Sequence, residues 1–195
     1  VRTARVHTDQ GKGITYRILN IEQALKQPYR SHWQVTKAGQ VVALGESKHF
    51  GDLANGSSQR DVVAIAANRT GLGYWLARSD GEVAAFGDAA NLGDLKEINL
   101  NRPIVDMAST PSGNGYWLVA SDGGIFSFGD AQFHGSTGAM RLNKPMTSLV
   151  QTRLGYDLVA EDGGVFNFNS PFLGSGASSA LSEPVVDATS RVSRW

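Results

Sequence analysis

Cysteine is absent from the sequence, and its absence excludes several kinds of chemistry. A chain without cysteine has no disulfide, no thiolate nucleophile and no Cys-ligated zinc or iron–sulfur site. Net charge is absent too, since 18 Lys and Arg balance 18 Asp and Glu, and basic residues do not cluster with aromatic ones as in nucleic-acid-binding proteins. No apolar run approaches the roughly 18 residues of a membrane span. We therefore expect neither nucleic-acid binding nor membrane insertion.

The signatures of common catalytic sites are also missing. The sequence has no Gly-x-Ser-x-Gly elbow, no phosphate-binding P-loop and no Asp-x-Asp-x-Asp calcium loop. The histidines are scattered and lack the spacing of metal ligands; they are His7, His32, His49 and His134. We predict that the protein is not an enzyme and uses neither a metal nor a cofactor.

Glycine is abundant, with 23 residues in 195 where about 7% is usual, and much of it lies within an internal repeat. The Tyr74-Trp75-Leu76 segment recurs 42 residues later as Tyr116-Trp117-Leu118, and after 40 more as Tyr156-Asp157-Leu158. Other segments recur in step, as Ser79-Asp80-Gly81, Ser121-Asp122-Gly123 and Glu161-Asp162-Gly163, and as Phe86-Gly87-Asp88-Ala89 and Phe128-Gly129-Asp130-Ala131. A less similar first copy around His32-Trp33 brings the number of copies to four.

Each copy reads as four short antiparallel strands. In the third copy we expect strands over Ile104–Ser109, Tyr116–Ala120 and Ile125–Phe128, with a short fourth strand near Phe133. Asp122-Gly123-Gly124 suits a type I′ hairpin turn, which requires positive φ. Four-stranded units of about 40–45 residues are typical of β-propeller blades. The sequence therefore predicts an all-β fold, a β-propeller.

We expect residues 1–195 to form a single domain. The repeats cover about 18–58, 59–100, 101–142 and 143–182, and Ile21–Lys26 is the expected first strand of the first copy. Residues 1–17 and 183–195 would complete the ring as a fifth blade shared between the two ends of the chain, because the segment from Glu183 to Thr189 matches the start of a repeat. A ring of four blades is the alternative.

One stretch resembles a known repeat. Residues 115–131, Gly-Tyr-Trp-Leu-Val-Ala-Ser-Asp-Gly-Gly-Ile-Phe-Ser-Phe-Gly-Asp-Ala, are similar to a unit found in arrays in secreted proteins of high-GC Gram-positive (actinobacterial-type) bacteria, often beside cell-wall amidases or peptidases. The resemblance covers residues 59–190 well and 30–58 less well. It implies a secreted or cell-surface location and a propeller-like accessory or binding module, and it names no ligand.

Three tryptophans are candidate ligand-binding residues. Trp33, Trp75 and Trp117 share one repeat position, and the fourth copy has Asp157 there. Because a fully buried position rarely accepts Asp, we expect this position to be partly exposed, so that the indoles could stack on sugars. The alternative is that each Trp packs between adjacent blades.

Carboxylates at a second repeat position are further candidates. Asp88, Asp130 and the matching Glu46 each follow a strand-ending glycine. They could contact a ligand, or they could cap turns. Charge is also uneven, since residues 1–60 carry nine Lys and Arg against four Asp and Glu, while residues 61–180 carry seven against twelve.

These observations favour a non-enzymatic recognition module that binds cell-wall or surface glycan, in the manner of a lectin, at repeated sites. The alternative is a protein–protein docking scaffold within a larger extracellular assembly. An enzyme with its site at the central channel is a third possibility. Glycan binding predicts exposed tryptophans in equivalent pockets, whereas docking predicts one asymmetric apolar patch or use of the basic N-terminal segment.

Overall fold

The fold is all-β and antiparallel. The computed structural model describes residues 6–8, 14–16, 32–54, 60–179 and 181–188, and this part of the chain contains thirteen strands and no helix. The strands are β1 Val6–Thr8, β2 Ile14–Tyr16, β3 His32–Val35, β4 Val41–Leu44, β5 Val62–Ala67, β6 Gly73–Arg78, β7 Val83–Gly87, β8 Ile104–Ser109, β9 Gly115–Ala120, β10 Ile125–Gly129, β11 Met146–Gln151, β12 Tyr156–Ala160 and β13 Val165–Phe168. The described residues form no helix that could span a membrane.

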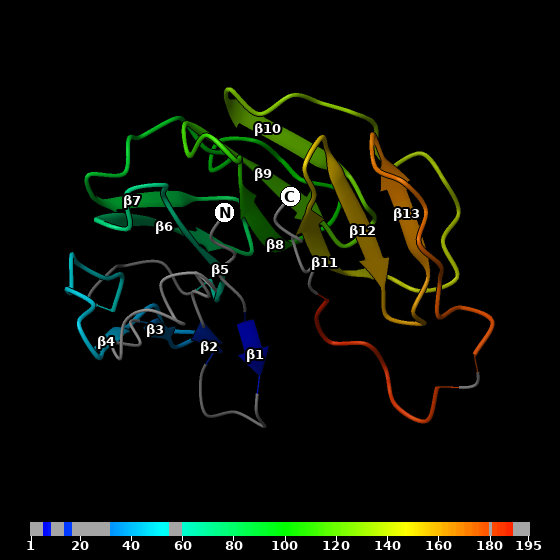
Figure 1. The fold of residues 1–195 in the computed structure, drawn as a ribbon, viewed down its shortest axis with the longest axis horizontal. Coiled ribbons are helices and arrows are strands. Elements are labelled where there is room, and N and C mark those ends of the chain that lie inside the picture. Colours follow the sequence, from blue (N-terminus) through cyan, green and yellow to red (C-terminus); the bar gives the residue numbers. More distant parts are fainter. Residues whose placement is uncertain (1–5, 9–13, 17–31, 55–59, 180, 189–195) are drawn as a thin grey trace.

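The strands form four sheets, one for each repeat. The first sheet has the order β1-β2-β3-β4, and the other three are β5-β6-β7, β8-β9-β10 and β11-β12-β13. The sheets follow one another in chain order around an arc (Figure 1). Strand β8 lies beside both β5 and β11, so the first strands of successive repeats are neighbours. We refer to the contact between two successive sheets as a seam.

The third repeat forms three of its four expected strands. The three strands expected in the third repeat are confirmed as β8, β9 and β10, within one residue at each end. A period of two in the sequence of each repeat favours strands here. An irregularity in register recurs at the same place in β5, β8 and β11. The three later sheets are therefore copies of one local structure.

The β9–β10 turn is not the type I′ turn that we expected. Gly123 has φ of +81°, but Asp122 is not in the positive-φ region. Instead, Asp122 Oδ1 accepts a hydrogen bond from the Gly124 N–H at 3.0 Å, and the Gly123 N–H donates to the Ala120 carbonyl. An Asp side chain that bonds the backbone two residues on is a turn device in its own right, so only the glycine has to adopt positive φ.

One predicted strand is absent, and one strand pairing was not predicted. No strand forms near Phe133, because the backbone there bonds to a side chain of the next repeat: the His134 N–H donates to Tyr156 Oη at 3.1 Å. Strands β1 and β2 lie within residues 1–17, the segment expected to take part in a fifth blade, and β2 pairs with β3 in the first sheet. The segment Ile21–Lys26 lies outside the described residues.

The core lies in the seams between successive sheets. Strands β6 and β9 are buried along their whole length, because each is the central strand of its sheet and is covered on both faces. Three separate clusters of apolar side chains fill the three seams. The stability of each repeat therefore depends on the sheets beside it.

Candidate functional site

A buried tyrosine closes each of the three seams. The three tyrosines lie at the start of the central strands of the second, third and fourth sheets, and all are fully buried. They are Tyr74, Tyr116 and Tyr156. Each hydroxyl donates to a glycine carbonyl of the preceding repeat. The acceptors are Gly51 at 2.6 Å, Gly93, and Gly135 at 2.7 Å. The same bond thus links every pair of described neighbouring sheets.

An aromatic ring covers the accepting glycine at two of these seams. A Cβ added at Gly51 would lie 2.4 Å from Phe86 Cδ1, and one at Gly135 would lie 2.6 Å from Phe168 Cδ1. At the remaining seam the corresponding distance from Gly93 to Phe128 Cδ1 is 3.4 Å. A side chain at Gly51 or Gly135 would therefore displace the ring, so the packing of these two seams requires glycine at this position.

Burial raises the pKa of each seam tyrosine above its ordinary value. Desolvation is the largest cause for Tyr74, Tyr116 and Tyr156, because burial penalises the charged phenolate. The nearby Asp94 carboxylate raises the pKa of Tyr116 further. Backbone hydrogen bonds oppose the effect at Tyr74 and Tyr156. The hydroxyls therefore remain neutral and act as donors within the seams.

The expectation that the repeat tryptophans are exposed is wrong. Trp33, Trp75 and Trp117 expose only 3%, 1% and 4% of their surface. Each ring packs on the tyrosine of the next repeat, with centroids 5.3, 5.4 and 5.4 Å apart. Each indole N–H donates to a backbone carbonyl, at 2.8–2.9 Å. Each indole lies in the seam between its own sheet and the next one, so the tryptophans pack between repeats, as the alternative interpretation had it.

Asp157 occupies the tryptophan position of the fourth sheet, and its surroundings explain the exception. Its side chain is half-buried and accepts a hydrogen bond from Asn167 Nδ2 at 2.7 Å. The tryptophan position faces the next repeat in each of the earlier sheets. Beyond β12, the described residues provide no further tyrosine-bearing strand, so this position tolerates a carboxylate.

The candidate carboxylates fall into two groups. Asp130 is exposed but accepts hydrogen bonds from Thr110 Oγ1 at 2.8 Å and from Ser112 Oγ. Asp88 accepts from Thr70 Oγ1 and from Asn68 Nδ2. Both carboxylates therefore brace the turn between the first two strands of their own repeat. Glu46 is exposed, and the structure does not bring these three carboxylates together into one site.

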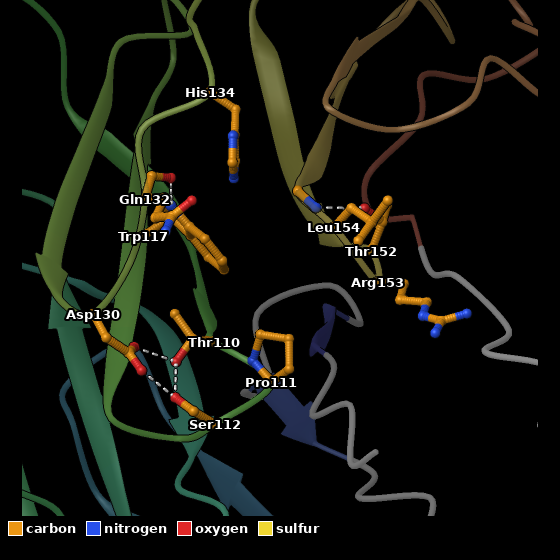
Figure 2. A pocket seen from close by; sticks show the side chains of 11 residues that line it. Thr110, Pro111, Ser112, Trp117, Asp130, Gln132, His134, Thr152, Arg153 and Leu154 are labelled. Atoms are coloured by element: carbon orange, nitrogen blue, oxygen red, sulfur yellow. Dashed lines mark hydrogen bonds between the residues drawn. The ribbon is translucent and has the colours of Figure 1, made fainter.

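A cleft of about 240 Å³ lies between the third and fourth sheets. It is bounded by the turn after β8, the segment after β10 and the turn after β11 (Figure 2). Trp117 and Leu154 give it apolar surface, and polar groups come from Gln132, His134 and Arg153. The sequence did not single out the last three residues. Gln132 and His134 occupy positions where the second repeat has Ala90 and Leu92, and Arg153 occupies the position of Pro111 in the third repeat. These departures were the signal available.

The corresponding surface beyond the fourth sheet is open. Leu173 occupies the position of Phe50, Leu92 and His134, which are half-buried in the seams, yet it is 91% exposed. Gly174 has φ of +125°, close to Gly51 and Gly135 at +135° and +130°. Among the described residues, no heavy atom lies within 4 Å of the position that a Cβ on Gly174 would take. We call Asp157, Leu173 and Gly174 the open face.

A segment after the open face continues the repeat. The Val185 N–H donates to the Glu161 carbonyl at 2.8 Å, as Met146 donates to Ser121 and Ile104 to Ser79 one and two repeats earlier. Ser148 Oγ bonds to Asp187 Oδ1 at 2.9 Å and to Asp106 Oδ2 at 3.2 Å, so that equivalent positions of three repeats meet. Residues 185–187 therefore lie where the first strand of a next unit would lie.

No protein-family model matches the chain, and no curated protein matches its sequence. Among solved structures, it is similar to a protein of unknown function from Bacteroides thetaiotaomicron, with 10% sequence identity and a TM-score of 0.52. The similarity covers 96% of this chain and 53% of that protein, so this chain spans about half of that protein's length. At this identity the likeness concerns the fold alone.

Proposed function

We propose that this chain is a docking scaffold for another protein, built from propeller-like blades, without enzymatic activity and exported to the cell surface or beyond. The blade assignment is supported by the repeated three-stranded sheets, by the arc in which they follow one another and by the bond from Val185 that begins a further unit. Export is supported by the resemblance of residues 115–131 to repeats of secreted proteins.

The open face is the observation that carries the docking proposal. Leu173 projects into solvent at a position that is packed in every described seam. Its exposure does not follow from its place in a loop alone, because Phe172 beside it is as exposed as its equivalent Phe133, at 64% and 60%. Of these two residues, only Leu173, whose equivalents pack in the seams, is more exposed than its equivalents. Large apolar side chains exposed together on one segment, here Phe172 and Leu173, mark a surface that can bind another protein.

Repeated glycan sites have less support. Such sites would need the three tryptophans to be accessible, and these side chains are buried within the seams. A sugar could not stack on an indole whose face is already covered by a tyrosine ring. The docking function is therefore favoured over glycan binding at equivalent blades.

The docking proposal is tested by comparing proteins captured by immobilised full-length chain from the culture supernatant of the organism that makes it. The variant Leu173→Asp places a charge on the open face, and Leu72→Asp makes the same change at a leucine that is 54% exposed in the second repeat. We expect a specific protein to be captured by the wild type and by Leu72→Asp and to be lost with Leu173→Asp.

Thermal unfolding of both variants checks that folding is retained. Capture of the same proteins by all three chains, or of none, would contradict docking at the open face.

A glycan function has one specific observation in its favour, the cleft of Figure 2. It combines an apolar edge from Trp117 and Leu154 with polar groups from Gln132 and Arg153, a composition suited to a polar ligand. If it binds peptidoglycan fragments, tryptophan fluorescence should change saturably on titration. The change should be reduced by Arg153→Ala, which removes an exposed side chain.

A further inference from the structure

We infer that the partner at the open face supplies a β-hairpin with a tyrosine at the start of its first strand, whose hydroxyl donates to the Gly174 carbonyl. This inference rests on the docking function proposed above and specifies the partner's chemistry. The three described seams share one arrangement and are continuous in sequence with the open face.

The hydrogen-bond acceptor in each seam is a glycine carbonyl. The carbonyls of Gly51, Gly93 and Gly135 each accept a bond from the tyrosine of the next repeat. Gly174 is the fourth glycine of the series and keeps the same left-handed backbone, at φ +125°. Such a φ strongly favours glycine. The acceptor of the seam is thus already formed where no donor from the described residues meets it.

The second step is the space above the glycine. At Gly51 and Gly135 a phenylalanine from the third strand of the next sheet fills the place of the missing Cβ. At Gly174 that place is free of the described residues. In the third sheet, Tyr116 and Phe128 are directly opposite one another on β9 and β10. A single hairpin therefore supplies both the hydroxyl and the ring.

The third step is the strand that receives the hairpin. Residues 185–187 already hold the position of a first strand through the Val185 bond to Glu161. In each later sheet the central strand pairs with such a first strand and the third strand pairs with the central one. A two-stranded hairpin, and not a whole sheet, is what would complete the unit. Hairpins added to an existing strand are a common mode of protein recognition.

The experiment uses a synthetic hairpin with the sequence of residues 115–129, closed through an added D-Pro-Gly turn so that it is folded when free. Its binding to the full chain is measured by calorimetry. We expect saturable binding that is lost with Gly174→Val, which adds bulk where the phenylalanine ring should lie, and with Leu173→Asp. Leu72→Asp is the matched control and should bind like the wild type.

Two further arms test the chemistry of the contact. A hairpin with Tyr116→Phe lacks only the hydroxyl and should bind roughly fivefold more weakly, the effect of one hydrogen bond. The chain variant Asp157→Trp restores the aromatic partner that tyrosines meet in the other seams, and should bind the tyrosine hairpin roughly threefold to tenfold more tightly.

No binding of the folded hairpin, or binding that Gly174→Val and Leu173→Asp leave unchanged, would overturn the inference. Self-association of the chain through this face, seen by sedimentation and abolished by Leu173→Asp, would also overturn it by making a second copy the occupant. The docking function fails separately, since protein capture that depends on Leu173 would survive a failure of the hairpin.

Discussion

The covered seams and the open face are the same local structure with and without a neighbour. Gly135 and Gly174 have nearly the same φ, at +130° and +125°, yet one is covered by the Phe168 ring and the other is covered by none of the described residues. The comparison teaches that the loop conformation is set within each repeat. What the neighbour adds is burial and the tyrosine bond.

The two regions also differ in what their sequence tolerates. Inside the seams the tryptophan position is filled by Trp33, Trp75 and Trp117, which pack on tyrosines. At the open face Asp157 takes this position and bonds to Asn167. A carboxylate is tolerated where solvent can reach it, since burying it against a ring without a partner would cost several kcal/mol.

The largest difference between the regions should appear when an apolar side chain is truncated. Tyr116→Ala removes a fully buried ring from the second seam, so we expect it to lower the free energy of unfolding by about 4 kcal/mol. Leu173→Ala at the open face should change it by less than about 0.5 kcal/mol. Urea denaturation of both variants measures the contrast, and equal losses would mean that the open face is covered in solution.

A smaller difference in stability should distinguish the cost of backbone strain from the cost of contact with a neighbouring ring. Gly51→Ala and Gly174→Ala place the same methyl group on similar left-handed backbones, but only the first meets a ring, at 2.4 Å from Phe86 Cδ1. Because no described residue lies beside the Gly174 position, we expect Gly51→Ala to destabilise the protein by about 1–3 kcal/mol more than Gly174→Ala. Similar losses in urea denaturation would show that the neighbouring ring adjusts without cost.

The smallest effect concerns pH, to which the seams and not the open face should respond. Burial raises the pKa of Tyr116 in the folded protein above that of the unfolded chain, so the unfolded state releases its proton first. The stabilisation is complete below about pH 10, the ordinary tyrosine pKa, and declines as pH rises above it. Tyr116→Phe should reduce this decline, whereas Leu173→Ala should leave it unchanged. Denaturation between pH 8 and pH 11 decides the matter.

Much of the fold could be predicted because the repeat displays its own alternation. The strands of the third repeat followed from the apolar spacing around Tyr116 and Ile125 and from glycine at the turns. The fourth strand near Phe133 was not predictable in this way. Whether that segment pairs as a strand or bonds to Tyr156 depends on a residue more than twenty positions away.

The candidate site was harder to predict. Asp88 and Asp130 could be identified as turn residues, but a choice between capping and ligand contact needed the positions of Thr70 and Thr110. Asp157 is misleading about the tryptophans, because a carboxylate in one copy of a repeat position suggests exposure in every copy. It reflects instead the position of the fourth sheet, beyond which the described residues form no further sheet.

The sequence by itself determined the unit: its strands, its turns and the glycines with left-handed backbone, because these depend on interactions within about forty residues. Only the tertiary structure decided which faces are buried, since burial depends on whether another sheet lies beside a given strand. The same reason places β2 against β3 and leaves Leu173 in solvent. Repeats in a chain can be nearly identical in local structure and still differ in function according to their neighbours.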